Sequence, residues 1–149
     1  MERTLIILKP DAVQRGLTGE IIRRFEQRGL KLVAMKLMSV PREMAEKHYA
    51  EHAGKGFYEG LVNYIISSPV VVLVLEAKNG IELARNMIGK TKPVDASPGT
   101  IRGDFGVEVG RNLVHGSDSQ ESAEREIALW FAPAEIVAWA RVNEPWIHE

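Results

Sequence analysis

A histidine at position 115 lies between a short apolar run and a polar turn, in the segment Asn112-Leu113-Val114-His115-Gly116-Ser117-Asp118. A side chain in such a place can be held firmly and still be reached by a substrate. The unperturbed pKa of histidine, about 6.5, leaves roughly three quarters of the imidazole neutral and therefore nucleophilic at pH 7. Gly116 has no Cβ, so we expect a bulky charged group to approach the ring from that side. The pattern predicts a nucleophilic His115, although a single histidine at a strand end more often serves a local hydrogen bond.

Cations gather in the sequence without a matching group of carboxylates. They are Lys9, Arg85, Lys90, Lys92 and Arg102, with Thr91 among them. Most of them belong to or flank residues 89–110, which contain five glycines, two prolines and no regular period. A loop of this length inside a compact domain is usually functional. If the fold brings these residues to the histidine, they would clamp a polyphosphate. Phosphoryl transfer is the reaction in which positioning and charge neutralisation carry most of the catalysis.

Three further motifs compete with this interpretation. Gly89-Lys90-Thr91 matches the end of a P-loop, but Ala84 stands where the first glycine is required, after a helical rather than a strand pattern. Asp104-Phe105-Gly106 matches a tripeptide of protein kinases, yet the chain lacks their other motifs. His48-Tyr49-Ala50-Glu51-His52 fits H-x-x-E-H, which on a helix would offer two zinc ligands. We expect a polar helix face there, because no third ligand is evident.

Composition limits the remaining classes. The chain has 149 residues, of which 45% are hydrophobic, enough for the core of a single domain over residues 1–149. A net charge of -1 and a pI near 6.4 argue against nucleic acid or an anionic membrane as partner. The absence of cysteine removes disulfides, thiolate metal sites and cysteine nucleophiles. The apolar run at residues 5–8 is too short for a signal peptide, and no run is long enough to span a membrane, so we expect a soluble cytoplasmic protein.

Apolar runs alternate with helical patterns along the chain. We predict strands at 3–8, 30–40, 70–75 and 112–114 and helices at 18–29, 42–51, 58–67, 81–88 and 121–131. The strand at 30–40 has apolar residues on both faces and should be covered on both sides for much of its length. The simplest packing is an α/β chain of the ferredoxin-like kind, an α+β sandwich with a four-stranded antiparallel sheet and helices on one face. A small doubly wound parallel sheet is the alternative.

Four segments together resemble the nucleoside diphosphate kinase family. They are the histidine motif at 112–118 and the segments Leu8-Lys9-Pro10-Asp11, Phe57-Tyr58-Glu59-Gly60-Leu61 and Pro98-Gly99-Thr100-Ile101-Arg102-Gly103-Asp104-Phe105. The similarity runs over essentially the whole chain, and the histidine motif is highly specific. It implies a ping-pong reaction in which a nucleoside triphosphate, mainly ATP, phosphorylates the histidine and a nucleoside diphosphate then collects the phosphoryl group.

The same resemblance implies roles for individual residues. Nδ1 of His115 would attack, and Glu126 would accept a hydrogen bond from the other ring nitrogen and so fix the tautomer. This arrangement has a cost, because a nearby carboxylate favours the protonated ring. The implied contacts are Lys9 and Tyr49 in the active site, Arg85, Thr91 and Arg102 on the phosphates, Asn112 with Lys9 on the ribose, and Phe57 with Leu61 on the base. One aromatic face stacks on any base, which predicts broad base tolerance. Mg2+ would bridge phosphate oxygens with few protein ligands.

Departures from the family pattern are few. Lys92 and Val94 stand where a small amide and an alanine are expected, and Ala12 replaces a glycine. We expect them to affect loop packing and subunit contacts rather than chemistry. The family forms tetramers or hexamers, and residues 132–149, a tail with two tryptophans, should be docked, which favours a hexamer. Two other classes stay open: a non-catalytic nucleotide-binding domain, and a zinc hydrolase built on the H-x-x-E-H motif.

Overall fold

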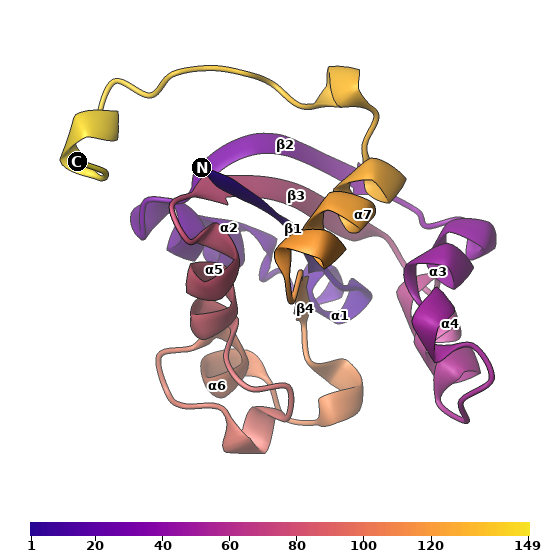
Figure 1. Cartoon of the computed structure of the whole chain (residues 1–149). Helices are drawn as coiled ribbons and strands as arrows, with labels where there is room; N and C mark the ends of the chain where they lie inside the picture. The colour runs from indigo at the N-terminus through magenta and orange to yellow at the C-terminus, as the bar shows by residue number, and fades with distance from the viewer.

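The computed structural model describes all residues from Met1 to Glu149. At its centre is a four-stranded antiparallel sheet in the order β2-β3-β1-β4 (Figure 1). The strands are β1 (Glu2–Leu8), β2 (Lys31–Met38), β3 (Val70–Ala77) and β4 (Val114–Gly116). This is the ferredoxin-like α+β arrangement, so the predicted antiparallel sheet is confirmed and the parallel alternative is wrong.

The two central strands are uninterrupted apolar runs because both of their faces are covered. In β1, Leu5 and Ile7 belong to one buried cluster, whereas Ile6 and Leu8 belong to the cluster on the opposite face. In β3, residues 70–75 alternate between the same two clusters and are all buried. Each of these two strands therefore contributes side chains to a hydrophobic core on either face of the sheet.

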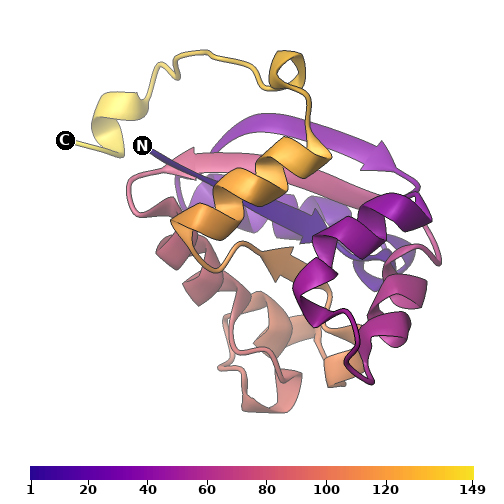
Figure 2. The same ribbon diagram turned by 45° about the vertical axis from the view of Figure 1, so that its right-hand side comes forward.

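Helices cover both faces of the sheet (Figure 2). One face carries four helices: α1 (Pro10–Gln14), α2 (Thr18–Gln27), α5 (Gly80–Ile88) and α6 (Ile101–Phe105). The other face carries three: α3 (Arg42–His48), α4 (Tyr58–Ile65) and α7 (Gln120–Trp130). The expectation of helices on one face is wrong. A strand that is apolar at every position, such as residues 70–75, already requires cover on both sides.

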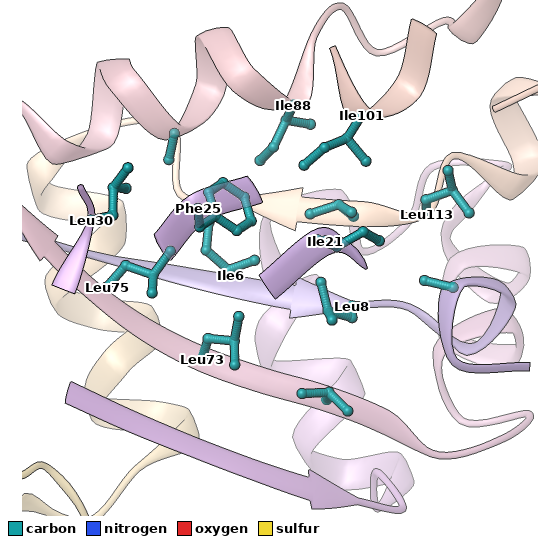
Figure 3. Close-up of a cluster of buried hydrophobic side chains, with 14 of the residues drawn as sticks. Ile6, Leu8, Ile21, Phe25, Leu30, Leu73, Leu75, Ile88, Ile101 and Leu113 are labelled. Carbon is teal, nitrogen blue, oxygen red and sulfur yellow. The ribbon is translucent and has the colours of Figure 1, made fainter. Parts of the chain in front are cut away.

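Figure 3 shows the core between the sheet and helices α2 and α5. Ile21 and Phe25 of α2 are fully buried over the sheet, next to Ile88 of α5. Burying a side chain of this size contributes roughly 1.5–3 kcal/mol, so this layer fixes both helices on the sheet. Ile101 of α6 and Leu113, just before β4, belong to the same cluster. The core therefore also supports the loop before the histidine motif and the first residues of that motif.

The edge strand β2 is covered less than its sequence predicted. An extra residue between Leu32 and Ala34 forms a β-bulge, which interrupts the alternation of side chains. Beyond the bulge, Met35 and Leu37 are 53% and 67% exposed. The prediction that residues 30–40 are covered on both sides for much of their length therefore fails in the second half of the strand.

The last residues leave α7 and run past β2 (Figure 1). The Val137 amide donates to the Val33 carbonyl at 2.8 Å, and the Trp139 indole nitrogen donates to the Leu32 carbonyl at 2.9 Å. The expected docking of the tail is confirmed here, whereas Trp146 is 90% exposed. None of the helices has the length and apolar character needed to cross a bilayer.

Candidate active site

A polar cleft of about 340 Å³ lies where the end of β1 meets β4, α3, α4, α5 and the loop at 89–110. The residues predicted for the site that line it are Lys9, Tyr49, Leu61, Arg85, Thr91, Arg102, Asn112, His115 and Glu126. Phe57 does not line the cleft but is half exposed beside His52, with ring centroids 5.2 Å apart. Lys90 and Lys92 are exposed and also lie outside the lining. The fold thus assembles most of the predicted residues, but not all.

His115 lies in the middle of β4, paired with Ile7 of β1, rather than after the strand as predicted. Its Nε2 is 3.0 Å from Oε1 of Glu126, on α7, and no protein group hydrogen-bonds its Nδ1. The Ser117 hydroxyl donates to the same carboxylate oxygen at 2.7 Å. Burial raises the pKa of Glu126, but the hydrogen bonds from His115 and Ser117 outweigh it and hold the pKa below its usual value. An ionised Glu126 accepts from Nε2–H, which leaves the lone pair on Nδ1.

Gly116 faces the core on the side where a Cβ would project. A Cβ on this residue would lie 2.7 Å from Cδ1 of Ile88 and 3.5 Å from Cδ1 of Ile6. Both atoms belong to the core between β4, β1 and α5. Gly116 also lines the cleft, so the expectation that it opens a side of His115 to a charged group stays a prediction.

Lys9 follows β1 and is almost fully buried in the wall of the cleft. Its Nζ donates to Oδ1 of Asn112 at 2.9 Å, and the Asn112 amide nitrogen donates to the Thr91 carbonyl at 3.2 Å. Burial, followed by the charge of Arg102, lowers the pKa of Lys9 to about 8. The ammonium is thus held in a position where an anionic ligand would stabilise it.

Arg102 is bonded to three backbone carbonyls. Nε donates to Asn112 at 3.1 Å, Nη1 to Gly89 at 3.0 Å and Nη2 to Val114 at 2.6 Å, which joins the long loop to β4. Burial, followed by the charge of Arg85, lowers the pKa of Arg102 to about 10. A guanidinium has five N–H donors, so two remain for a ligand. Lys9, Arg85 and Arg102 bond to carbonyls and an amide rather than to the carboxylates of the cleft, so their positive charges are available to an anionic ligand such as a polyphosphate.

His48, which the sequence offered only as part of a zinc motif, lies directly against the candidate nucleophile. Its ring centroid is 4.8 Å from that of His115, and it is almost fully buried. Its Nδ1 accepts a hydrogen bond from the indole nitrogen of Trp130 at 3.1 Å. Because an indole only donates, His48 must carry its proton on Nε2. Burial, followed by the charge of His115, lowers the pKa of His48 to about 3, so the ring is neutral.

This geometry does not suit the H-x-x-E-H zinc site. Helix α3 ends at His48, and a separate turn of 3-10 helix covers Ala50–His52, so the two motif histidines do not share a helical face. His48, His115 and Glu126 do offer three ligand atoms within 4.8 Å of one another. A metal on the free nitrogen of His48 would move the proton to Nδ1 and break the bond to Trp130.

Sequence reasoning gave no role to Asp11, Tyr64 or Ser117. Tyr64 lines the cleft from α4, three residues after Leu61, so the helical spacing alone places both on one face. Asp11 and Ser117 belong to the motifs that carried the resemblance, which was the only signal for them.

An oriented histidine in a cleft lined by cations, on this α+β fold, defines a nucleotide phosphotransferase. The family model described as nucleoside diphosphate kinase matches residues 2–136. The nucleoside diphosphate kinase of Archaeoglobus fulgidus is 59% identical over 149 residues, covering 100% of this chain and 99% of that protein. The enzyme of Chloroflexus aggregans is 62% identical over 151 residues, covering 100% of both chains.

Solved structures agree. A nucleoside diphosphate kinase family protein from Babesia bovis superposes with a TM-score of 0.97 at 48% identity, covering 99% of this chain and 100% of that one. The halophilic enzyme of Halobacterium salinarum, solved in complex with CDP, also gives 0.97 at 48% identity, covering 99% of both chains. The chain belongs to the nucleoside diphosphate kinase family, whose enzymes transfer phosphoryl groups between nucleotides.

Proposed function

We propose that the chain transfers the terminal phosphoryl group of a nucleoside triphosphate, mainly ATP, to a nucleoside diphosphate through a phosphohistidine at His115. One observation carries this proposal: Nδ1 is free in the cleft while Nε2 is held by Glu126. The Nδ1 lone pair forms the bond to the terminal phosphorus as the bond to the bridging oxygen breaks, which releases the diphosphate. The ring gains positive charge, and Glu126 stabilises it while Nε2 keeps its proton. A second diphosphate reverses these steps.

The cleft residues take the roles that the charges favour. Arg85 and Arg102, with the Thr91 hydroxyl, bind the phosphates, and Lys9 neutralises charge and reaches the ribose together with Asn112. Burial, followed by the charge of Glu126, raises the pKa of Tyr49 to about 12, so its hydroxyl stays protonated and can donate. Phe57 and Leu61 contact the base from the rim. The relative from Halobacterium salinarum was solved with CDP, and we infer that pyrimidine as well as purine diphosphates are accepted here.

The carboxylates of the cleft favour Mg2+ carried by the nucleotide. Glu126 is occupied by His115 and Ser117, whereas Glu51 and Asp118 are exposed and belong to different elements. Such residues fit a cation that keeps most of its waters and is held mainly by phosphate oxygens. When bound, Mg2+ neutralises and aligns those oxygens. Lys9 and Arg102, buried beside them, would hold the same phosphates from the protein side.

We further infer that residues 1–149 act as one domain in a cytoplasmic homo-oligomer, a hexamer rather than a tetramer, whose partners are nucleotides and not nucleic acid or membranes. Met35 and Leu37, both exposed and on one face of the edge strand β2, support association, because neighbouring exposed apolar side chains often mark an interface. Sedimentation should give the mass of six protomers. A mass near four would overturn the hexamer.

The decisive experiment is the intact mass of the protein after brief mixing with ATP and Mg2+, held at alkaline pH because phosphohistidine is acid-labile. We expect a gain of one phosphoryl group that disappears on a chase with GDP, with GTP formed. His115→Ala should bind ATP and gain nothing. ATP binding without a phosphoryl gain in the wild type would instead indicate the non-catalytic nucleotide-binding class.

A further inference from the structure

Leu113, directly before β4, adopts a backbone conformation that its side chain disfavours. Its φ is +73°, in the left-handed region where a bulky residue is an outlier. The Val114 amide donates to the Asn112 carbonyl at 2.8 Å, which closes a turn of three residues. A conformation of this kind persists only where the surrounding contacts over-determine it. The neighbours of Leu113 must therefore hold the turn.

Asp11, in the first turn of α1, is the side chain that does so. Its Oδ2 accepts a hydrogen bond from the Leu113 amide at 3.1 Å, and its Oδ1 accepts one from the Tyr64 hydroxyl. The Lys9 amide donates to the Leu113 carbonyl at 2.8 Å, so both backbone polar groups of Leu113 bond to residues 9–11. Burial, followed by the hydrogen bond to Asp11, raises the pKa of Tyr64, so the phenol remains a donor.

The turn determines where Asn112 points. It reverses the chain within one peptide, so Asn112 faces Lys9 and Thr91 while Val114 pairs at once with Leu8 of β1. If Leu113 relaxed to a negative φ, the preceding peptide would rotate and the two side-chain hydrogen bonds of Asn112 would be lost.

We propose that Asp11 is a positioning residue for nucleotide binding, which holds the strained turn at Leu113 and is itself held by Tyr64. Asp11 does not line the cleft, so it acts through Asn112 and Lys9 and not by touching the ligand. The inference rests on the proposed nucleotide site and adds a residue to it. His115 depends less on the turn, because it pairs with β1. Loss of Asp11 should therefore weaken binding more than it slows phosphorylation at saturating ATP.

The first test is the affinity for ADP, which cannot phosphorylate the histidine, measured by calorimetry. Asp11→Ala should weaken ADP binding about tenfold, since the bonds of Asn112 are disrupted. Phosphorylation at saturating ATP should stay within about threefold of the wild type, because the β4 pairing is kept. Asp11→Asn should stay within about twofold in affinity, because its carboxamide oxygen can accept from Leu113 and its NH2 can donate to the Tyr64 oxygen. A purely electrostatic role would make Asp11→Asn as weak as Asp11→Ala.

Glu2 provides a matched control at the other end of β1. Its Oε1 accepts a hydrogen bond from the Ile81 amide at 3.1 Å, shortly after Asn79, whose φ is +52°. Glu2→Ala therefore also removes a bond from a backbone amide to a carboxylate near a residue of positive φ, but far from the cleft. Its ADP affinity should equal that of the wild type even if its melting temperature falls.

The second test removes the strain itself. Leu113→Gly and Leu113→Ala both delete a buried side chain, but only glycine adopts a positive φ freely. With Asp11 present, the two variants should bind ADP alike. Combined with Asp11→Ala, the glycine variant should bind ADP about fivefold more tightly than the alanine variant, because its turn no longer needs the carboxylate.

The outcomes separate this inference from the proposed function. Equal ADP affinity of the wild type and Asp11→Ala, or of the two double variants, overturns the role of Asp11. A wild type that binds ADP but is not phosphorylated by ATP overturns the proposed reaction and leaves the ADP comparison intact. If Asp11→Ala does not fold, Asp11→Ser replaces it in both tests, since its short hydroxyl cannot bond to both the Leu113 amide and the Tyr64 hydroxyl.

Discussion

Nucleotide binding should be accompanied by proton uptake at Lys9. In the free protein, burial and the neighbouring Arg102 lower the pKa of Lys9 to about 8. A polyphosphate placed against the ammonium favours the charged form and raises that pKa again. Between these two pKa values, binding converts neutral Lys9 into the ammonium and takes a proton from the buffer.

The magnitude follows from the pKa of the free protein. With a value of about 8, Lys9 is deprotonated in about 10% of molecules at pH 7, about 50% at pH 8 and about 90% at pH 9. The number of protons taken up per bound nucleotide should therefore rise from about 0.1 at pH 7 to about 0.5 at pH 8 and about 0.9 at pH 9. The dissociation constant should increase above pH 8, approaching tenfold per pH unit. The terminal phosphate, with a second pKa of about 6, is about 90% ionised at pH 7 and almost fully ionised at pH 8 and 9, so it contributes little at the two higher pH values.

Calorimetry of ADP binding in two buffers of different ionisation enthalpy measures this uptake directly. The slope of observed enthalpy against ionisation enthalpy gives the number of protons, at pH 7, 8 and 9 in turn. Lys9→Met removes the titrating group and should bind ADP more weakly, with no buffer dependence at pH 8.

Two results would refute the reasoning. Buffer-independent enthalpy of the wild type at pH 8 would mean that Lys9 is fully charged in the free cleft. Equal uptake by Lys9→Met would assign the proton to another group.

The same pKa also determines how the stability of the free protein changes with pH. Because the unfolded lysine titrates near 10.5 and the folded one near 8, Lys9 should make the free protein more stable as pH rises through this window.

Four further substitutions test separate parts of the protein. Glu126→Gln keeps the shape but loses the charge beside the ring, so quenched-flow phosphorylation should slow about 100-fold at unchanged ADP affinity; a wild-type rate would disprove its role. The pKa of His48 is about 3 in the folded protein and about 6.5 in the unfolded chain, so the unfolded chain binds a proton first as pH falls. The free energy of unfolding, measured with urea, should therefore fall by up to about 1.4 kcal/mol per pH unit between about 6.5 and 3. His48→Asn, which keeps an acceptor for Trp130, should lose that part of the slope, and an identical slope would contradict it. A Cβ on Gly103 would overlap a loop carbonyl, so Gly103→Ala should lower the melting temperature, whereas Gly19→Ala in open space on α2 should raise stability by about 0.5–1 kcal/mol. Equal melting temperatures of these two variants would show that the loop yields freely.

The periodicity of the sequence predicted which segments are strands better than it predicted where a short strand lies or which strand residues are exposed. The runs at 5–8 and 70–75 are central strands because every position is apolar. The strand β4 has only three residues and is too short to show a period. The sequence therefore predicted it at 112–114, whereas it covers Val114–Gly116 with His115 at its centre. The exposure of Met35 and Leu37 was not predictable, since a bulge and an edge position leave no trace in an apolar pattern.

Residues far apart in sequence carry the parts of the site that could not be predicted. The proton on His48 is fixed by Trp130, which is 82 positions away. Asp11 reaches Leu113 across 102 positions, and no local pattern signals that a buried leucine has a positive φ. The resemblance to a known family supplied Glu126, because nothing in the spacing alone indicates that it faces His115.

Burial drives three groups of the free cleft towards their neutral forms, with opposite directions of pKa. It lowers the pKa of Lys9 to about 8 and of His48 to about 3, and it raises that of Tyr49 to about 12. A phosphate acts on these groups unequally. Lys9 lies in the cleft wall with a pKa of about 8, so a bound phosphate converts it to the charged form near that pH. The tautomer of His48 is fixed by the hydrogen bond from Trp130, and the pKa of Tyr49 lies far above neutrality. Between pH 8 and 9, therefore, affinity for the nucleotide should depend on pH while the phosphorylation rate at saturating ATP should not.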